Sequence, residues 1–309
     1  MTQDEAQRRR WTFYEAVKIH ERKDRLAHIV SLDVMLTVLF AALLHAAWNA
    51  FIKSGDNKLV DTVILVTGAG VVAAAILPFV PAPAEASWPF LVASVAIHCL
   101  YFCLVAVTYR TGDLSFAYPI MRGSAPLFTS ILTAVILGEQ IGRGGWLGIL
   151  LLCAGILWLA RDGWRSAHSQ KLALVSGLLN AAVIVAYTIV DGLGARAAQN
   201  AWSYVLWMFF LNMFPLLAIG FMSNARAVVS VPVGGWVKGF VGGSCSVCAY
   251  GLALWAMTQA PIALVAALRE TSVLFGTALG ALLLKERFGY ARWLAAALIT
   301  AGAVAMKAL

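Results

Sequence analysis

Three charged residues, Arg122, Arg269 and Glu270, stand inside long apolar stretches of the sequence. A charge in the middle of a bilayer costs at least about 2.5–3.5 kcal/mol on insertion scales, so these side chains must face a bundle interior or a wet cavity. Two guanidinium groups offer paired donors that suit a carboxylate or a phosphonate. We therefore interpret the three residues as a substrate-binding site, with Glu270 as a switch or proton carrier. The competing interpretation is a fixed ionic cluster that holds two helices together.

Aromatic and polar residues in other apolar stretches are expected to line the same cavity. This set comprises Tyr118, Trp48, Asn49, His98, Tyr187 and Trp255, with Tyr101 and Tyr250 beside them. An aromatic lining suits an amphiphilic solute, although each aromatic residue alone is more often a packing residue or an interfacial anchor. His45 and His98 are also candidate proton carriers, and for each we favour a hydrogen-bonded structural role.

Prolines and glycines mark two of these stretches. Pro119 and Pro126 flank Arg122, and each proline removes a helix hydrogen bond and favours a kink. The freed carbonyls would then line the cavity, and bending for packing alone is the alternative. Gly276 and Gly280 have the spacing of small residues at a close helix contact.

The composition indicates that the elements carrying these residues are surrounded by lipid. The chain has 309 residues, of which 61% are hydrophobic and 12% are charged, whereas a soluble chain has about 45–50% apolar and about 25% charged residues. Lipid requires every backbone polar group to be paired internally, and long unbroken apolar runs favour helices over a barrel. The net charge is +8, and most of the basic residues stand in tails and short connections. Anionic lipid headgroups, rather than nucleic acid, are their expected partner.

The sequence contains no convincing motif for a cofactor, a metal or ATP. Cys245 and Cys248 have the spacing of a metal or redox motif, but they stand inside an apolar run without a second Cys or His pair. Helix packing by small residues is the preferred interpretation. A Walker-type phosphate loop is missing, so energy from bound ATP is not expected.

Ten apolar runs approach or reach the roughly 20 residues that cross a bilayer. They cover residues 34–52, 59–80, 88–109, 114–138, 146–160, 172–190, 203–222, 236–257, 261–284 and 290–307. The sequence thus predicts an all-α integral membrane protein with ten transmembrane helices. Residues 1–33 form a basic extension that is either interfacial or poorly ordered, and Met35 is a candidate alternative start.

The second half of the sequence repeats the first at an offset of 147 residues. The pairs in register include Arg122 with Arg269, Glu139 with Glu286, Gly142 with Gly289, and Trp146 with Trp293. Each unit holds five helices, and because five is odd the second unit must enter the membrane from the opposite side. We therefore predict two inverted five-helix repeats, at 34–165 and 170–309, around a central cavity. This arrangement is common among secondary transporters.

The distribution of basic residues leaves the membrane orientation open. With the extension included, the side that holds the termini has 10 Lys and Arg and the other side has 9; without it the comparison is 3 against 9. The loops alone therefore put the termini outside by the positive-inside rule, whereas the extension favours the inside.

Several segments resemble EamA-domain proteins of the drug/metabolite transporter superfamily. These segments are 44–53 (LHAAWNAFIK), 117–123 (AYPIMRG) with Pro126, Gly138-Glu139, 267–272 (ALRETS) and 285–287 (KER). The resemblance covers nearly the whole chain apart from the extension. It implies a ten-helix basket with a cavity open to one side, both termini in the cytoplasm, and gradient-driven transport. The solutes of such proteins are often exported amino acids, amines, carboxylates or other metabolites.

These observations predict gradient-driven transport, most simply export, of a small polar metabolite across a bacterial inner membrane. The expected partners are the solute, the lipid bilayer and protons as a coupling ion, with the protein as a monomer or homodimer. The alternative is an intramembrane enzyme or flippase acting on a lipid headgroup. Against it, Asp61, Asp113, Asp162 and Asp191 are expected at scattered helix ends rather than in a cluster. A structural membrane partner, the third possibility, would not need charged residues within its spans.

Overall fold

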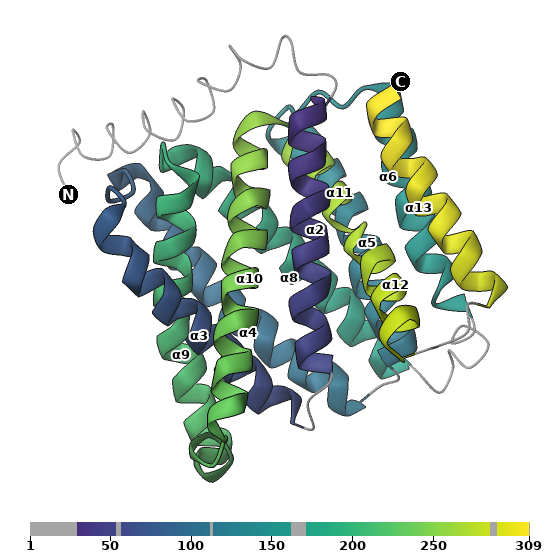
Figure 1. The fold of residues 1–309 in the computed structure, drawn as a ribbon. Coiled ribbons are helices and arrows are strands. Elements are labelled where there is room, and N and C mark those ends of the chain that lie inside the picture. Colours follow the sequence, from purple (N-terminus) through teal and green to yellow (C-terminus); the bar gives the residue numbers. More distant parts are fainter. Residues whose placement is uncertain (1–29, 54–56, 112–113, 162–170, 285–288, 309) are drawn as a thin grey trace.

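The computed structural model describes residues 30–53, 57–111, 114–161, 171–284 and 289–308, and most of the basic extension lies outside this part. Every regular element in the described part is helical. The α-helices are α2 (Leu32–Lys53), α3 (Lys58–Ile76), α4 (Trp88–Thr111), α5 (Leu114–Ile136), α6 (Arg143–Trp158), α8 (Lys171–Ala197), α9 (Ala201–Val229), α10 (Val233–Gln259), α11 (Ile262–Arg269), α12 (Ser272–Leu284) and α13 (Tyr290–Ala308). The start of α2 and the end of α13 lie at the same end of the bundle (Figure 1).

Six helices in the described part are long and apolar enough to cross a membrane. They are α2, α3, α5, α8, α9 and α10. The fifth expected span, α6, is a shorter apolar helix of 16 residues. The structure therefore supports an all-helical membrane protein with several spans.

The ninth expected span is divided into two helices. α11 begins after Pro261 and ends at Arg269, and α12 begins at Ser272. Between them, Glu270 caps α11 with its backbone N–H, and the Thr271 hydroxyl donates to the Leu268 carbonyl at 2.7 Å. The sequence predicted one continuous helix from 261 to 284. The division places Glu270 at a helix junction in the interior of the bundle.

Helices α6 and α13 form an antiparallel pair that joins the two halves of the chain (Figure 1). A Cβ added at Gly148 would meet Met306 and the carbonyl of Gly302, whereas one added at Gly155 would meet Ile299. The contacts thus run in opposite directions along the two helices. Small residues allow this close approach of two backbones.

Helices α3 and α9 form a second antiparallel pair between the halves. A Cβ at Gly70 would meet Met213, and one at Gly220 would meet Val63. Two further sets of interfaces correspond between the halves: α2 packs on α10, α11 and α12, and α8 packs on α4 and α5, whereas α3 packs more extensively on α10 than its counterpart α9 packs on α4. Exchanging the first five helical segments with the second five therefore maps each of these contacts onto another.

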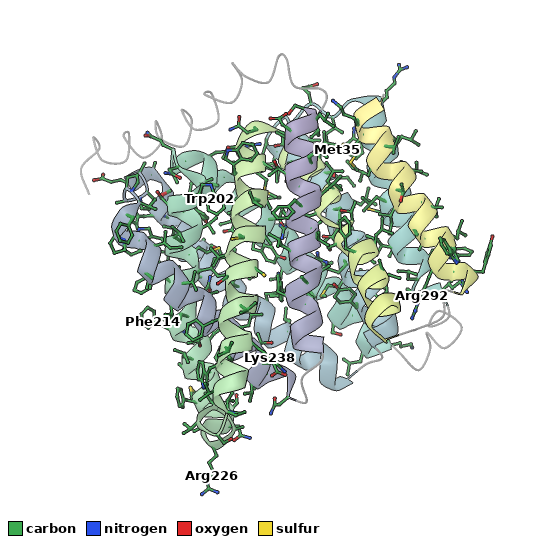
Figure 2. All side chains as sticks on the ribbon, viewed as in Figure 1. Met35, Trp202, Phe214, Arg226, Lys238 and Arg292 are labelled. Carbon is green, nitrogen blue, oxygen red and sulfur yellow. The ribbon has the colours of Figure 1, made fainter. Side chains whose placement is uncertain are left out.

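The outside of the bundle presents large apolar side chains. Val92, Val135 and Phe214 are 67%, 77% and 52% exposed, respectively. Figure 2 shows Arg226 at the lower tip of the bundle and Arg292 at its right side, near the lower end of α13. An apolar flank with charged ends is the surface that a bilayer favours.

Two expectations about individual residues are wrong. Asp191 does not lie at a helix end, because α8 continues to Ala197 and buries this carboxylate completely. Gly276 does not mark a close helix contact: a Cβ added there would meet nothing within 4 Å. Gly280, its proposed companion, lies at a position whose surroundings the structure does not describe.

Candidate functional site

The centre of the site is an ion pair between α5 and the junction that follows α11. Arg122 Nε lies 2.8 Å from Glu270 Oε2, and the two side chains are only 5% and 7% exposed. These two atoms do not form a well-aligned hydrogen bond, and Arg122 Nη2 has no hydrogen-bond partner within the described residues. A buried guanidinium normally satisfies its donors. At least one guanidinium N–H group of Arg122 is therefore without an acceptor among the described residues.

Arg269 supplies the second positive charge of the site. Its guanidinium carbon lies 5.0 Å from the ring centroid of Tyr250, a distance typical of a cation–π contact. In the described part of the chain, no carboxylate lies at ion-pair distance from Arg269. Arg122 and Arg269 carry two positive charges and Glu270 one negative charge, so the three residues together have a net positive charge when ionised.

A small cavity is lined by all three charged residues. Its volume is about 10 Å³, which is room for about one water molecule. Thr129 on α5 and Thr188 on α8 add hydroxyl groups to the lining. The cavity is much smaller than the central cavity that the family resemblance implies. Binding of a solute larger than water there requires the lining side chains to move.

Aromatic side chains form one wall beside the cavity. Tyr187 lines the cavity directly and stacks on His98, with ring centroids 4.7 Å apart. Tyr101 meets the edge of Tyr187 at 5.7 Å, and Tyr118 packs against the same cluster one turn before Arg122. His98 Nδ1 is held by Ser94. Four of the aromatic or polar residues expected at the site therefore do lie together.

Trp48, Asn49 and Trp255 do not line this cavity. Trp48 packs against α3 and α9 and meets the edge of His45 at 4.9 Å. The Asn49 amide donates to the His45 carbonyl at 2.8 Å, and Trp255 packs against the large apolar core. These residues remain candidates for a solute path rather than for direct contact in this cavity.

A second ionic cluster lies where α5 ends and α11 begins. Glu139 is fully buried and accepts the backbone N–H groups of Ile262 at 2.8 Å and Ala263 at 3.2 Å. Arg196 Nη2 donates to Glu139 at 3.0 Å, and its Nε donates to the Met257 carbonyl at 2.8 Å. A carboxylate at a helix N-terminus satisfies otherwise unpaired N–H groups and opposes the helix dipole.

From the sequence, Glu139 was noted for its match to Glu286 in the repeat and for the family resemblance of Gly138-Glu139, without a structural role. Two sequence features could have indicated its structural role. Gly138 adopts a positive φ of 68°, as glycine does when a chain turns at a helix C-terminus. Pro261 precedes α11, which is a helix-start signal. The long-range pairing with Arg196 has no local signature.

Asp191, expected from the sequence at a helix end, is another buried carboxylate. It accepts hydrogen bonds from two tyrosines, Tyr204 and Tyr250, and is 0% exposed. The sequence feature that could have indicated it is a charged residue at the end of an apolar run. The helix continues past that residue, through Gly192 and Gly194. In the described part of the chain, no group of three His, Cys, Asp or Glu residues could hold a metal ion.

Comparison with known families identifies both halves of the chain. Residues 33–161 and residues 171–307 each match the sequence profile of the EamA-like transporter family. Together the two matches cover most of the chain, including both arginines and Glu270.

Individual relatives add the fold but no substrate. A 75-residue segment is 32% identical to the uncharacterized protein y4nH of Sinorhizobium fredii (strain NBRC 101917 / NGR234), covering 24% of this chain and 64% of that protein. This chain therefore spans less than two thirds of that relative's length. A solved crystal structure superimposes with a TM-score of 0.71 over 89% of this chain and 96% of that chain, at 20% identity. This likeness establishes a shared fold.

Proposed function

The chain belongs to the EamA-like transporter family, and we propose that it is a gradient-driven transporter that exports a small metabolite carrying a carboxylate or another anionic group. Members of this family are transporters of the drug/metabolite transporter superfamily. A bilayer and a small-molecule solute are accordingly the partners of the protein. The bacterial inner membrane is the proposed location.

The proposed architecture is ten spans arranged as two inverted five-helix repeats. The matched pairs of interfaces between the halves support it, as do the antiparallel contacts of α3 with α9 and of α6 with α13. In such an arrangement the two halves can exchange conformations, and access to a central site then alternates between the two sides. α11 and α12 would together form one discontinuous span.

The unpartnered Arg122 Nη2 donor carries the proposal for the binding site. It lies in the cavity beside Arg269, which has no carboxylate at ion-pair distance among the described residues. A carboxylate or phosphonate would satisfy both guanidinium groups by charge-assisted hydrogen bonds. Glu270 would then act as the switch, because it occupies Arg122 until the solute competes for it.

Tyr187 and Thr188 complete the proposed site from α8. The ring of Tyr187 offers an apolar wall, and the hydroxyl of Thr188 offers a further donor. Thr129 approaches from α5. This combination favours a small solute with one anionic end and an apolar or amphiphilic body over a large hydrophilic one.

Transport by purified protein in liposomes tests the proposal. The panel consists of radiolabelled amino acids, amines, carboxylates and phosphonates, with and without a pH gradient. We expect uptake of at least one anionic solute by the wild-type protein. The uptake rate should fall by about 10- to 100-fold in Arg122→Lys, because a lysine ammonium cannot replace a bidentate guanidinium donor.

Arg226→Lys is the matched control, since Arg226 is exposed at the end of the bundle. Its uptake should equal that of the wild type, and thermal unfolding should be the same for all three proteins. Absence of transport for every solute under any gradient would contradict the proposed function. Wild-type uptake by a folded Arg122→Lys protein would contradict the proposed site.

A further inference from the structure

An apolar groove lies between α12 and α13, outside the cavity that the charged residues line. Its volume is about 310 Å³, against about 10 Å³ for that cavity, and ligand pockets commonly have volumes of about 300–1,000 Å³. Val273 and Leu274 line it from α12, and Leu159 lines it from the end of α6. Trp293 on α13 also lines the groove and is 63% exposed, so the groove opens toward the outside of the bundle.

The two halves of the chain differ at this place. In the first half α5 packs along α6, whereas in the second half α12 and α13 scarcely touch and run apart toward the lower end of the bundle (Figure 1). The break between α11 and α12, at Glu270 and Thr271, separates the direction of α12 from that of α11, and α12 packs on α2 instead. The groove therefore occupies the position at which the first half has a helix contact.

Side-chain size contributes to the open groove. The offset of 147 residues that aligns the two halves pairs Ile131 with Ala278 and Ile149 with Ala296. Ala278 and Ala296 both line the groove, and Ile149 is completely buried in the first half. At two positions the second half thus has an alanine where the first half has an isoleucine, and the missing volume is part of the groove.

The lining of the groove is suited to an apolar occupant. Most of the lining side chains are Ala, Val, Leu or Ile. The Thr277 hydroxyl donates to the Val273 carbonyl at 2.7 Å, so its hydrogen-bonding capacity as a donor is used within its own helix. Empty space beside such a wall loses van der Waals contacts. On the flank of a membrane protein, the material at hand to fill that space is a lipid acyl chain.

One end of the groove is basic and lies near an end of the bundle. Arg292 lines the groove near the lower end of α13 (Figure 2), and from there the lining continues past Ile299, at least about 10 Å along the helix. Residues 285–292 include three basic residues and one acidic residue. Trp293 is of a type enriched at the headgroup level. Arginine suits phosphate recognition, and basic pockets between transmembrane helices bind phospholipid headgroups.

We therefore propose that the groove between α12 and α13 binds a phospholipid with an anionic headgroup. One acyl chain lies against Ala278 and Ala296, and the phosphate contacts Arg292. The bound lipid takes the place of the helix contact of the first half, and it supports α12 directly after the junction that carries Glu270. This site is separate from the proposed solute site, so the inference stands whether or not the chain transports a solute.

Native mass spectrometry of the delipidated protein tests the site. The probe is phosphatidylglycerol, added in steps, with phosphatidylcholine as the neutral comparison. One phosphatidylglycerol molecule should bind the wild type more tightly than phosphatidylcholine does. Ala296→Ile places the side chain of the first half in the groove and should weaken this binding by about tenfold or more. Ala297→Ile adds the same volume at an exposed position of α13 outside the groove, and it should leave the binding unchanged.

Arg292→Gln tests the headgroup contact. Removal of one positive charge near the membrane surface should weaken phosphatidylglycerol binding by about fivefold, and phosphatidylcholine binding should stay the same. Arg226→Gln is the matched control, because it removes an exposed arginine at the lower tip of the bundle. Equal losses in the two variants would mean that overall charge alone attracts the lipid, and they would overturn the assignment to the groove.

A photoreactive lipid locates the site in the unaltered protein. Phosphatidylglycerol with a diazirine in one acyl chain should label residues 272–284 and 290–308 more strongly than the exposed apolar flank around Val92 and Val135. Even labelling of all exposed apolar surfaces would overturn the proposal. A contact between two copies of the chain through α12 and α13, detected by intermolecular cross-linking, would also overturn it.

The variants also separate the lipid from a solute as the occupant. If Ala296→Ile does not fold, Ala278→Ile makes the equivalent change on the opposite wall. Wild-type phosphatidylglycerol binding by either folded variant contradicts a lipid in the groove. A loss of solute uptake in Ala296→Ile with unchanged lipid binding would assign the groove to the solute instead. A wild-type protein that moves no solute contradicts the proposed function alone, since lipid binding is measured without transport.

Discussion

The Glu139–Arg196 pair and the Arg122–Glu270 pair each join a buried carboxylate to an arginine in the other half of the chain. Around Glu139, both oxygens accept N–H groups from α11 and from Arg196, and Arg196 also donates to backbone carbonyls. Around Arg122 the ion pair is as short, but one guanidinium donor has no hydrogen-bond partner among the described residues. The hydrogen-bonding groups of the two ion pairs are thus satisfied to different degrees, although both pairs join an arginine to a glutamate.

The difference indicates which pair holds the fold and which can change during a transport cycle. A fully bonded buried network is rigid, because any movement exposes several unpaired groups at once. A partly satisfied pair gains bonds when a ligand arrives, so it can exchange one partner for another. Four changes would break or sharpen this comparison.

The largest effect on stability is expected for Glu139→Ala. The change leaves Arg196 without its carboxylate and two N–H groups of α11 without acceptors, which corresponds to about 3–5 kcal/mol for a broken buried pair. Thermal unfolding in detergent measures the loss. Glu85→Ala removes an exposed carboxylate and should have little effect. Equal unfolding temperatures for the two variants would contradict a structural role of Glu139.

The double change of Arg122→Met with Glu270→Met should separate function from stability. Replacing a buried ion pair by apolar residues is often neutral or stabilising by about 1–4 kcal/mol, so the protein should unfold at the wild-type temperature or higher. Uptake should fall to the background of empty liposomes. A strongly destabilised double variant would instead support the fixed ionic cluster considered for these residues.

Arg196→Lys tests the geometry of the rigid pair. The guanidinium donates to Glu139 and to the carbonyls of Met257 and Ala260, and a lysine ammonium cannot reproduce this planar pattern. We expect a loss of about 1–3 kcal/mol in unfolding free energy. Transport by the protein that remains folded should be close to normal, and a selective loss of transport would place Arg196 in the transport step.

Thr188→Val should give the smallest effect. It removes a hydroxyl from the cavity lining with little change in volume, which corresponds to about 0.5–1.5 kcal/mol and a rise of about two- to tenfold in KM. Thermal unfolding should not change. Thr300→Val, at an exposed position on α13, is the control and should leave KM unaltered. An unaltered KM in Thr188→Val would mean that this hydroxyl does not contact the solute.

The helical membrane character and the meeting of Arg122 with Glu270 could be predicted from the sequence. Apolar runs report burial in lipid directly, and a charge inside such a run requires a partner from another helix. The register of the repeat placed Arg122 and Arg269 at equivalent depths. The structure then added the division at Glu270, which arises from cap hydrogen bonds that no hydropathy pattern records.

Other parts of the site could not be predicted, because they depend on contacts between distant segments. The role of Glu139 requires the N-terminus of α11, more than a hundred residues later in the chain. The burial of Asp191 depends on Tyr204 and Tyr250, which approach from two other helices. Conversely, Trp48 was expected at the cavity because of its type alone, and packing directs it toward α3 and α9 instead.

The pairing of α6 with α13 also has a consequence for how the molecule is made. Gly148 and Gly155 offer flat backbone surface that only α13 covers so closely, and α13 follows every other described helix in the chain. During synthesis the glycine face of α6 therefore has no α13 to pack against until residues 290–308 have been made. Formation of the α6–α13 contact is thus necessarily a late step in the assembly of the bundle.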